Sequence, residues 1–315
     1  MFEEKEDDSA STMTIAFGKA IINLTKIIKQ LKPDLVFSGF DIGANFAAAV
    51  VGAHMNIHVA HLEGGEITGT IDESIRHAIS KFAHIHFTSN EQATKRLIKM
   101  GESSKNIFTV GNPSLDVIKS IKFISKKELE KEFNINLEKP LLLIVQHTVT
   151  TEINEIDKYF LETINAIKET NHQAIIISGN SDAGSQKIKK IIKNSNILNY
   201  ENLPFVKYIS LLHHSSAIIG NSSSGIMEAP FLHIPSINIG TRQEGRGKTT
   251  SIINVTYNKY EIKTAINKIL TDKKFLNSIK KQKNQHGNGD ACKKIVQILE
   301  KLKFENIPIQ KKLSY

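Results

Sequence analysis

Three carboxylates in the first third of the chain stand where predicted strands end. Asp41 follows the apolar run DLVFSGF, Glu63 follows IHVAHL, and Asp72 opens the helical stretch after them. Because the carboxyl ends of neighbouring parallel strands lie at one edge of a sheet, we expect these acids to gather there. Like charges held close together raise one another's pKa, which suits groups that exchange protons near neutral pH. The three acids therefore predict an acid/base site.

An ordinary structural role is the competing interpretation of these acids. Thr70 and Glu73 have the T-x-x-E spacing of a capping box, in which side chains bond to the first N–H groups of a helix. Asp41, Glu63 and Asp72 could likewise be caps or loop residues that face water. Asp72 is not needed for the capping box, so the box alone does not explain the cluster.

A second group of polar residues follows the apolar run AIIG at 217–220. Ser222 and Ser223 lie in a turn before a predicted helix at 224–232, where backbone N–H groups and the helix dipole favour a phosphate. Glu228 lies about one turn further on and could accept hydrogen bonds from two ribose hydroxyls. Arg242 and Arg246 follow the next strand and add positive charge at the same edge. The alternative is a capped turn beside a solvated loop.

His147 ends the apolar run LLLIVQH, so it lies at the carboxyl end of a predicted strand. There it could pair with a phosphate or move a proton, although a single histidine is often structural. The other candidate histidines are His58 with His61, which face opposite sides of a strand, and His84 with His86, which share one face. The second pair is expected in the core, and no metal site is predicted.

Nucleotide cofactor motifs are missing. No G-x-G-x-x-G follows a predicted strand, so the sequence does not support NAD binding. The segment RQEGRGKTT ends like a Walker A loop, but Arg242 stands where that loop needs glycine. No cofactor is predicted.

Composition points to a globular protein that acts on a small substrate. The 315 residues are 40% hydrophobic and carry a formal charge of +9, with the lysines scattered over helix faces. This spread argues against nucleic acid as a partner and suits an anionic substrate. The single Cys292 fits a reducing compartment. The acidic start is unlike a signal peptide and no run reaches membrane-spanning length, so a cytoplasmic location without membrane contact is expected.

Short apolar runs alternate with helical stretches along the whole chain. Such alternation predicts an α/β fold with parallel sheets covered by helices. The expected strands lie at 34–38, 57–62, 84–89, 107–111, 141–147, 174–178, 217–220 and 235–239, and the expected helices at 12–31, 44–54, 72–81, 91–100, 153–168, 184–193, 204–213 and 224–232.

The strands form two series, which predict two Rossmann-like doubly wound domains with a ligand cleft between them. Residues 1–120 are expected to form the first domain, with 291–315 packing back on it, and residues 121–290 the second. The first series opens with a helix and has only four visible strands. We therefore expect the first domain to be short at its amino end.

Five segments together resemble the hydrolysing UDP-N-acetylglucosamine 2-epimerases. They are HLEGGEITGTIDESIRHAISK, QHTVTTE, NSDAGS, GNSSSG with its following glutamate, and NIGTRQEGR, and the match runs in order from about residue 32 to 303. The first segment separates the hydrolysing from the non-hydrolysing group. The resemblance implies a glycosyltransferase-B-like fold, and elimination of UDP followed by hydration of the resulting glycal. It further implies a homo-oligomer that serves sialic or legionaminic acid synthesis.

The resemblance also implies residue roles. By position, the acid/base carboxylates and the diphosphate-side histidine correspond to Asp41, Glu63, Asp72 and His147. The nucleotide contacts correspond to Ser222, Ser223 and Arg242, with Glu228 on the ribose. Two features depart from the family: the opening strand with its arginine loop is not found, and Phe40-Asp41-Ile42 stands where many members have G-D-R.

Several interpretations remain open at this stage. The substrate can be UDP-N-acetylglucosamine or a UDP-2,4-diacetamido-6-deoxy sugar. The departures also allow a catalytically impaired nucleotide-sugar binder or half of a split epimerase. A glycosyltransferase of the same fold is the third possibility, but a cluster of three acids argues against it.

Overall fold

A computed structural model describes residues 10–40, 42–178, 184–246 and 249–314. The chain forms two compact units, residues 1–119 with 285–315 and residues 120–284. Each unit is built on one parallel sheet. The predicted α/β class with two Rossmann-like units is confirmed.

The first unit contains a four-stranded sheet in the order β1-β2-β3-β4. Its strands are β1 (Leu35–Ser38), β2 (His58–Leu62), β3 (Ile85–Thr88) and β4 (Ile107–Thr109). Its helices are α1 (Ala10–Leu31), α2 (Gly43–His54), α3 (Ile71–Phe82), α4 (Glu91–Lys99), α5 (Pro113–Ser120) and α13 (Ala291–Lys301). All described strand pairs are parallel, so the segments that follow Ser38, Leu62 and Thr88 begin at the same edge of the sheet.

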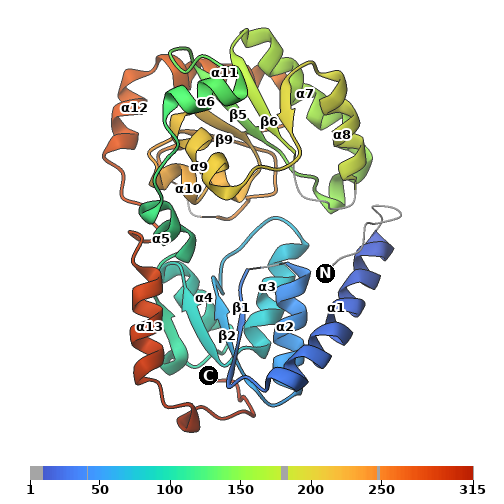
Figure 1. The fold of residues 1–315 in the computed structure, drawn as a ribbon, viewed down its shortest axis with the longest axis vertical. Helices are drawn as coiled ribbons and strands as arrows, with labels where there is room; N and C mark the ends of the chain where they lie inside the picture. Colours follow the sequence, from blue (N-terminus) through green and yellow to red (C-terminus); the bar gives the residue numbers. More distant parts are fainter. Residues whose placement is uncertain (1–9, 41, 179–183, 247–248, 315) are drawn as a thin grey trace. The chain divides into compact units, whose positions relative to one another are not determined.

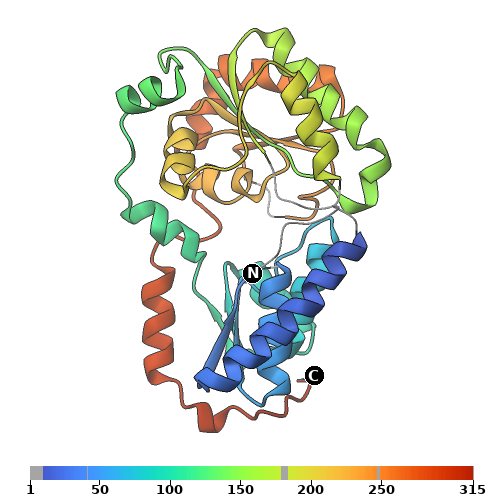
Figure 2. The ribbon, with the colours of Figure 1, turned by 45° about the vertical axis from the view of Figure 1, so that its right-hand side comes forward.

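Two apolar clusters cover this sheet. One joins β1 and β2 to α1, α2 and α3 through buried side chains such as Val36, Val51 and Ile79. The other joins β2 and β3 to α13 and the tail through Phe87, Ile295 and others. Burial on both faces explains why these strands read as continuous apolar runs. Helix α1 lies along α2 (Figure 1 and Figure 2).

The second unit contains a six-stranded sheet in the order β10-β9-β8-β5-β6-β7. Its strands are β5 (Leu141–Val145), β6 (Gln173–Ile177), β7 (Leu198–Tyr200), β8 (Ala217–Gly220), β9 (Ser236–Ile239) and β10 (Ile252–Val255). Its helices are α6 (Lys126–Phe133), α7 (Ile156–Thr170), α8 (Ser185–Asn194), α9 (Phe205–His214), α10 (Glu228–Phe231), α11 (Lys259–Thr271) and α12 (Lys273–Lys280).

The strand order of the second unit reverses between β5 and β8. The chain runs outward from β5 to β6 and β7, then crosses to the other side of β5 and continues through β8, β9 and β10. Ligands of doubly wound sheets bind outside the carboxyl ends of the strands at such a reversal. The loops that leave β5 and β8 are therefore the first place to look for a site.

No helix in the described part of the chain combines the length and apolar character needed to cross a bilayer. Among the described residues, no group of three or more histidine, cysteine or acidic side chains is arranged to hold a metal ion.

Candidate active site

Asn221 joins the two loops at the reversal point of the second unit. Its side-chain Oδ1 accepts a hydrogen bond from the His147 N–H at 2.6 Å, and its Nδ2 donates to the His147 carbonyl oxygen at 2.9 Å. Its own carbonyl oxygen accepts from Arg242 Nη1 at 3.1 Å and from Gln243 Nε2 at 2.8 Å. His147 and Arg242, which the sequence predicts as site residues, are thus brought together around one buried asparagine.

Gly220 is what lets β8 approach β5 so closely at this point. Its φ of +133° lies outside the range that other residues favour. A Cβ atom there would lie 2.1 Å from the Val145 carbonyl oxygen. Any side chain at this position would push the Asn221 turn away from His147.

The turn after Asn221 differs from the prediction of a helix over 224–232. A 3₁₀ turn covers Ser223–Gly225, and α10 has only four residues. The N–H groups of Gly225, Ile226 and Met227 already donate to the carbonyl oxygens of Ser222 and Ser223. Because the helix is so short, its dipole is weak, so the predicted helix-dipole argument for phosphate binding is wrong.

Hydroxyl groups are what this turn offers a ligand. Ser222 caps the turn by accepting from the Ser224 N–H at 3.3 Å, and Ser223 is half-buried. Tyr208 on α9 places its buried hydroxyl beside Ser222 and Ser224, and it lies close enough to Glu228 to interact electrostatically. Burial raises the pKa of Tyr208 well above its ordinary value, and the neighbouring serine hydroxyls only partly oppose this rise. The buried Tyr208 hydroxyl makes no hydrogen bond within the described part of the chain. Tyr208 therefore remains a neutral donor beneath the turn.

The loop that carries Arg242 is fixed by Glu152. Its carboxylate accepts from Thr241 Oγ1 and from the Tyr257 hydroxyl, both at 2.7 Å. The Tyr257 ring stacks on Tyr159, with 4.0 Å between the ring centroids. Glu152 belongs to the segment QHTVTTE, so the same segment supplies His147 and anchors the arginine loop.

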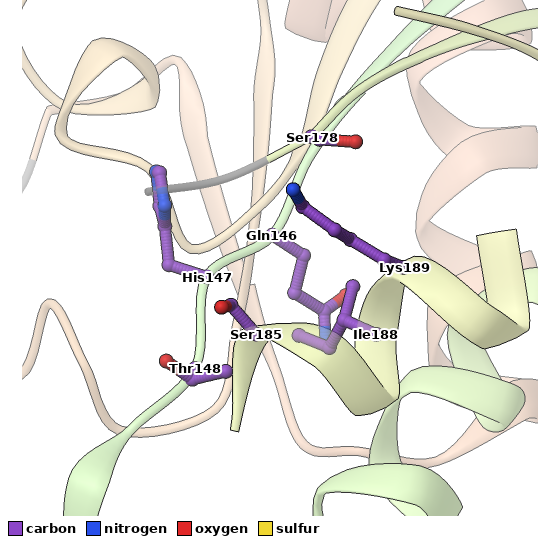
Figure 3. A pocket seen from close by; sticks show the side chains of 7 residues that line it. All are labelled: Gln146, His147, Thr148, Ser178, Ser185, Ile188 and Lys189. Atoms are coloured by element: carbon purple, nitrogen blue, oxygen red, sulfur yellow. The ribbon is translucent and has the colours of Figure 1, made fainter. Parts of the chain in front are cut away.

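A small pocket opens beside His147 at the ends of β5 and β6. It is lined by Gln146, His147, Thr148, Ser178, Ser185, Ile188 and Lys189. Figure 3 shows the side chains of Gln146 and His147 pointing away from each other, as expected for successive residues of an extended chain. Gln146 is 2% exposed, and its Oε1 accepts from Thr163 Oγ1 at 2.8 Å. His147 is the half-buried member of the two and is the better placed to meet a ligand.

Glu63 leaves β2 of the first unit in a left-handed backbone conformation. Its φ is +61°, and its N–H donates to the Phe87 carbonyl oxygen at 2.9 Å. Gly65 follows with φ of +81°, and its carbonyl oxygen accepts from Arg96. A non-glycine residue in this region is strained, which is common where a side chain is needed at a functional site.

Asp72 stands in the first turn of α3, where Thr70 is the cap and accepts from the Asp72 N–H at 3.3 Å. The predicted capping box does not form. Glu73 instead accepts from the Thr68 N–H at 2.8 Å and lies 3.8 Å from His77. Glu73 thus has a structural role in holding the loop, whereas Asp72 is half-buried at the junction that also carries Glu63.

Glu66 is a buried acid of this junction for which the sequence analysis predicts no role. It is 4% exposed and accepts a hydrogen bond from Asn90 Nδ2. His286 Nδ1 lies 3.9 Å from its carboxylate, and Arg76 Nη1 donates to its carbonyl oxygen at 3.1 Å. The Arg76 and Asn90 contacts span 10 and 24 residues, and the His286 contact joins two distant parts of the sequence, so no local pattern could have revealed them.

His61 of β2, His86 of β3 and His84, which directly precedes β3, are buried. His61 Nδ1 lies 3.0 Å from Ser80 Oγ, and burial lowers the pKa of His61 well below its ordinary value. His84 Nε2 bonds to the carbonyl oxygen of Ile309 in the tail, and His86 Nε2 bonds to Glu102. His84 and His86 are 4% and 1% exposed, as expected for core residues.

Glu102 is the centre of a buried ionic cluster. Its carboxylate contacts Lys81 at 2.8 Å and His86 at 3.2 Å, and it also contacts Lys311 of the tail. Burial alone would raise the pKa of Glu102, but hydrogen bonds from these three partners outweigh it and lower the pKa to about 2. The cluster fastens the tail to the first unit.

Of the predicted site residues, Glu63 and Asp72 lie at one junction of the first unit. The residues predicted to contact the nucleotide lie in the second unit and are His147, Ser222, Ser223, Glu228 and Arg242. Asp41 lies outside the residues that the structure describes. Asn221, Tyr208, Glu66 and Gln243 are further residues of these two places.

Comparison with known proteins decides the family. The sequence model of the UDP-N-acetylglucosamine 2-epimerase family matches residues 4–300. The chain belongs to this family.

Relatives that align with most of the chain support this membership. A Legionella pneumophila protein named UDP-N,N'-diacetylbacillosamine 2-epimerase (hydrolyzing) is 33% identical over 97% of this chain and 81% of its own. A Campylobacter jejuni protein named GDP/UDP-N,N'-diacetylbacillosamine 2-epimerase (hydrolyzing) is 38% identical over 80% of this chain and 67% of its own.

A solved structure shows the same fold. The UDP-GlcNAc 2-epimerase from Neisseria meningitidis, bound to UDP-GlcNAc, superposes with a TM-score of 0.79 at 21% identity, covering 95% of this chain and 84% of that one. The glycosyltransferase-B-like architecture of this 2-epimerase family member is thereby established.

Proposed function

We propose that this member of the 2-epimerase family is a hydrolysing enzyme that converts a UDP-2-acetamido sugar into UDP and the free manno-configured sugar. The observation that carries the proposal is the Legionella relative, which bears the hydrolysing name and aligns with 97% of this chain. The block GGEITGTID, whose resemblance is to the hydrolysing group, agrees with it.

The second unit is assigned to the nucleotide. Arg242 and the hydroxyls of Ser222 and Ser223 would hold the diphosphate, because a cation and hydroxyl donors stabilise the negative charge that develops as UDP leaves. His147 would contact the leaving phosphate. Glu228, next to Tyr208, would accept from the ribose hydroxyls. The convergence of His147 and Arg242 on Asn221 supports this assignment.

The carboxylates of the first unit are assigned to proton transfer. In the first step one carboxylate removes the C2 proton while the C1–oxygen bond to UDP breaks, which leaves a 2-acetamidoglycal. In the second step water adds its hydroxyl at C1, and C2 receives a proton on its opposite face. The net reaction consumes one water and yields UDP and the epimerised sugar. Two faces require more than one group, and Asp41, Glu63 and Asp72 are the candidates.

The sugar is proposed to be either UDP-N-acetylglucosamine or a UDP-2,4-diacetamido-6-deoxy sugar. The named substrates of the Legionella and Campylobacter relatives favour the second. Free manno-configured products of this kind are precursors of sialic and legionaminic acids, which is the role we propose.

Product analysis with both substrates tests the proposal. Purified protein is incubated with each UDP-sugar, and UDP, free sugar and UDP-sugar epimer are separated and quantified. Equal amounts of UDP and a free manno-configured sugar are expected. A product that retains UDP would show a non-hydrolysing epimerase, and UDP release with the gluco configuration kept would show a simple hydrolase.

A further inference from the structure

Asn221 holds the backbone of His147 through both ends of its side-chain amide. The residue is 1% exposed. Strands β5 and β8 pair as far as Val145 and Gly220, so the two bonds to His147 continue the ladder with a side chain where the main chains separate. The Asn221 amide therefore fixes the position of the His147 backbone relative to the end of β8.

We propose that Asn221 is a positioning residue for His147 and Arg242 in the proposed reaction, an inference that rests on the proposed function. Its N–H donates to the Val145 carbonyl oxygen at 3.2 Å, and its carbonyl oxygen accepts from Arg242 and Gln243. One residue thus ties together the ends of β5, β8 and β9. Because both His147 and Arg242 form hydrogen bonds with Asn221, this residue fixes the distance between them.

Only asparagine supplies what the geometry requires. The His147 N–H needs an acceptor and the His147 carbonyl oxygen needs a donor, both within one planar group. An aspartate at position 221 would set a carboxylate oxygen against the carbonyl oxygen, about where Nδ2 now lies. Protonation would restore a donor there, so the aspartate variant is expected to depend on pH in a way that the native residue does not.

The test is the pH profile of UDP release by Asn221→Asp. A displacement of about 1 Å in an active site can lower the rate by about 100-fold, which is the loss expected at pH 8. Burial and the facing carbonyl oxygen favour the protonated form of the new carboxyl group, whereas the Arg242 guanidinium and the His147 N–H favour the charged form. We expect burial to outweigh them, so that the group gains its proton as pH falls to mildly acidic values. At pH 5.5 the variant should recover at least about tenfold relative to the native protein at the same pH.

Asn238→Asp is the matched control. Asn238 is 5% exposed at the carboxyl-end half of β9, and its Nδ2 donates to Asn254 Oδ1 at 2.9 Å, not to a site residue. This substitution places the same charge at similar burial one strand away. Its rate relative to the native protein should not recover as pH falls. Asn221→Ser adds no charge and should lose activity without recovery at low pH, which covers the case that Asn221→Asp fails to fold.

A readout that does not depend on turnover separates this inference from the proposed function. Ring-labelled histidine spectra give the His147 signal, assigned from its loss in His147→Gln. Because the ring itself gains a proton in this pH range, each variant is compared with the native protein at the same pH. Asn221→Asp should differ from the native signal at pH 8 and match it at pH 5.5. If the native protein releases no UDP but this shift occurs, the function fails and the positioning role stands. The positioning role is overturned by an unmoved His147 signal, by a native pH profile in Asn221→Asp, or by equal recovery in Asn238→Asp.

Discussion

Glu63 carries a carboxylate on a backbone conformation that favours glycine. Replacing it should therefore affect both the stability of the first unit and the activity. The φ of Glu63 is +61°. A left-handed conformation costs a residue with a Cβ atom about 1–2 kcal/mol. Glycine avoids that cost but loses about 0.4–1 kcal/mol through the extra freedom of the unfolded chain. Glu63→Gly should therefore be more stable than Glu63→Ala by roughly 1 kcal/mol.

Both substitutions remove the carboxylate, so both should lower UDP release by about 100-fold or more if Glu63 transfers a proton. The assay pairs turnover with urea unfolding followed by one probe in each unit, since Glu63 lies in the first unit and the control residue in the second. Asn171 is the matched control, since it has φ of +53° at the end of α7 and lies outside the site. Asn171→Gly and Asn171→Ala should reproduce the stability difference without losing activity.

Two results would refute the reasoning about Glu63. Near-native turnover in either Glu63 variant would remove it from the acid/base set. A Glu63→Ala variant at least as stable as Glu63→Gly, while the Asn171 pair differs as expected, would show that the backbone strain is absent or is relieved by the loop.

Two further predictions follow from the buried clusters. The pKa of Glu102 falls from 4.5 to about 2 on folding, so its contribution to stability is complete above about pH 4.5 and is lost as pH falls toward 2. Glu102→Gln should destabilise the first unit by about 3 kcal/mol at pH 7. In chemical unfolding, its free energy of unfolding should also depend less on pH between 4.5 and 2 than that of the native protein. Glu138→Gln, at an exposed ion pair, is the control and should change the free energy of unfolding little. Tyr208→Phe removes the hydroxyl beside Ser222 and Ser224 and should weaken UDP binding by about fivefold in calorimetry, with an almost unchanged melting temperature. If Tyr208→Phe binds UDP with native affinity, the Tyr208 hydroxyl takes no part in nucleotide binding.

The fold class followed from the sequence because burial on both faces leaves a readable signal. Strands such as β5 and β8 are continuous apolar runs, and they were predicted within a residue or two. Strands β7 and β10 were missed, since they are short and partly exposed at the sheet edges. The helix predicted over 224–232 was wrong because the small residues and Pro230 support only one α-helical turn.

The candidate site could be predicted only where a charged or ionisable side chain follows the end of a predicted strand. His147 and Arg242 meet this condition, and the structure brings them to one asparagine. Asn221 itself follows a strand-ending glycine at the reversal point, a signal that could have identified it. Tyr208 and Glu66 contact residues of other helices and loops, and nothing in their local pattern distinguishes them from ordinary core or loop residues.

The most direct test of the proposed chemistry is the fate of hydrogen at C2 during turnover in heavy water. Elimination followed by hydration predicts that each released sugar molecule carries one deuterium at C2, in the manno configuration, with an equal amount of UDP. Free sugar with the original hydrogen at C2 would contradict removal of the C2 proton, and with it the assignment of the first-unit carboxylates to acid/base catalysis.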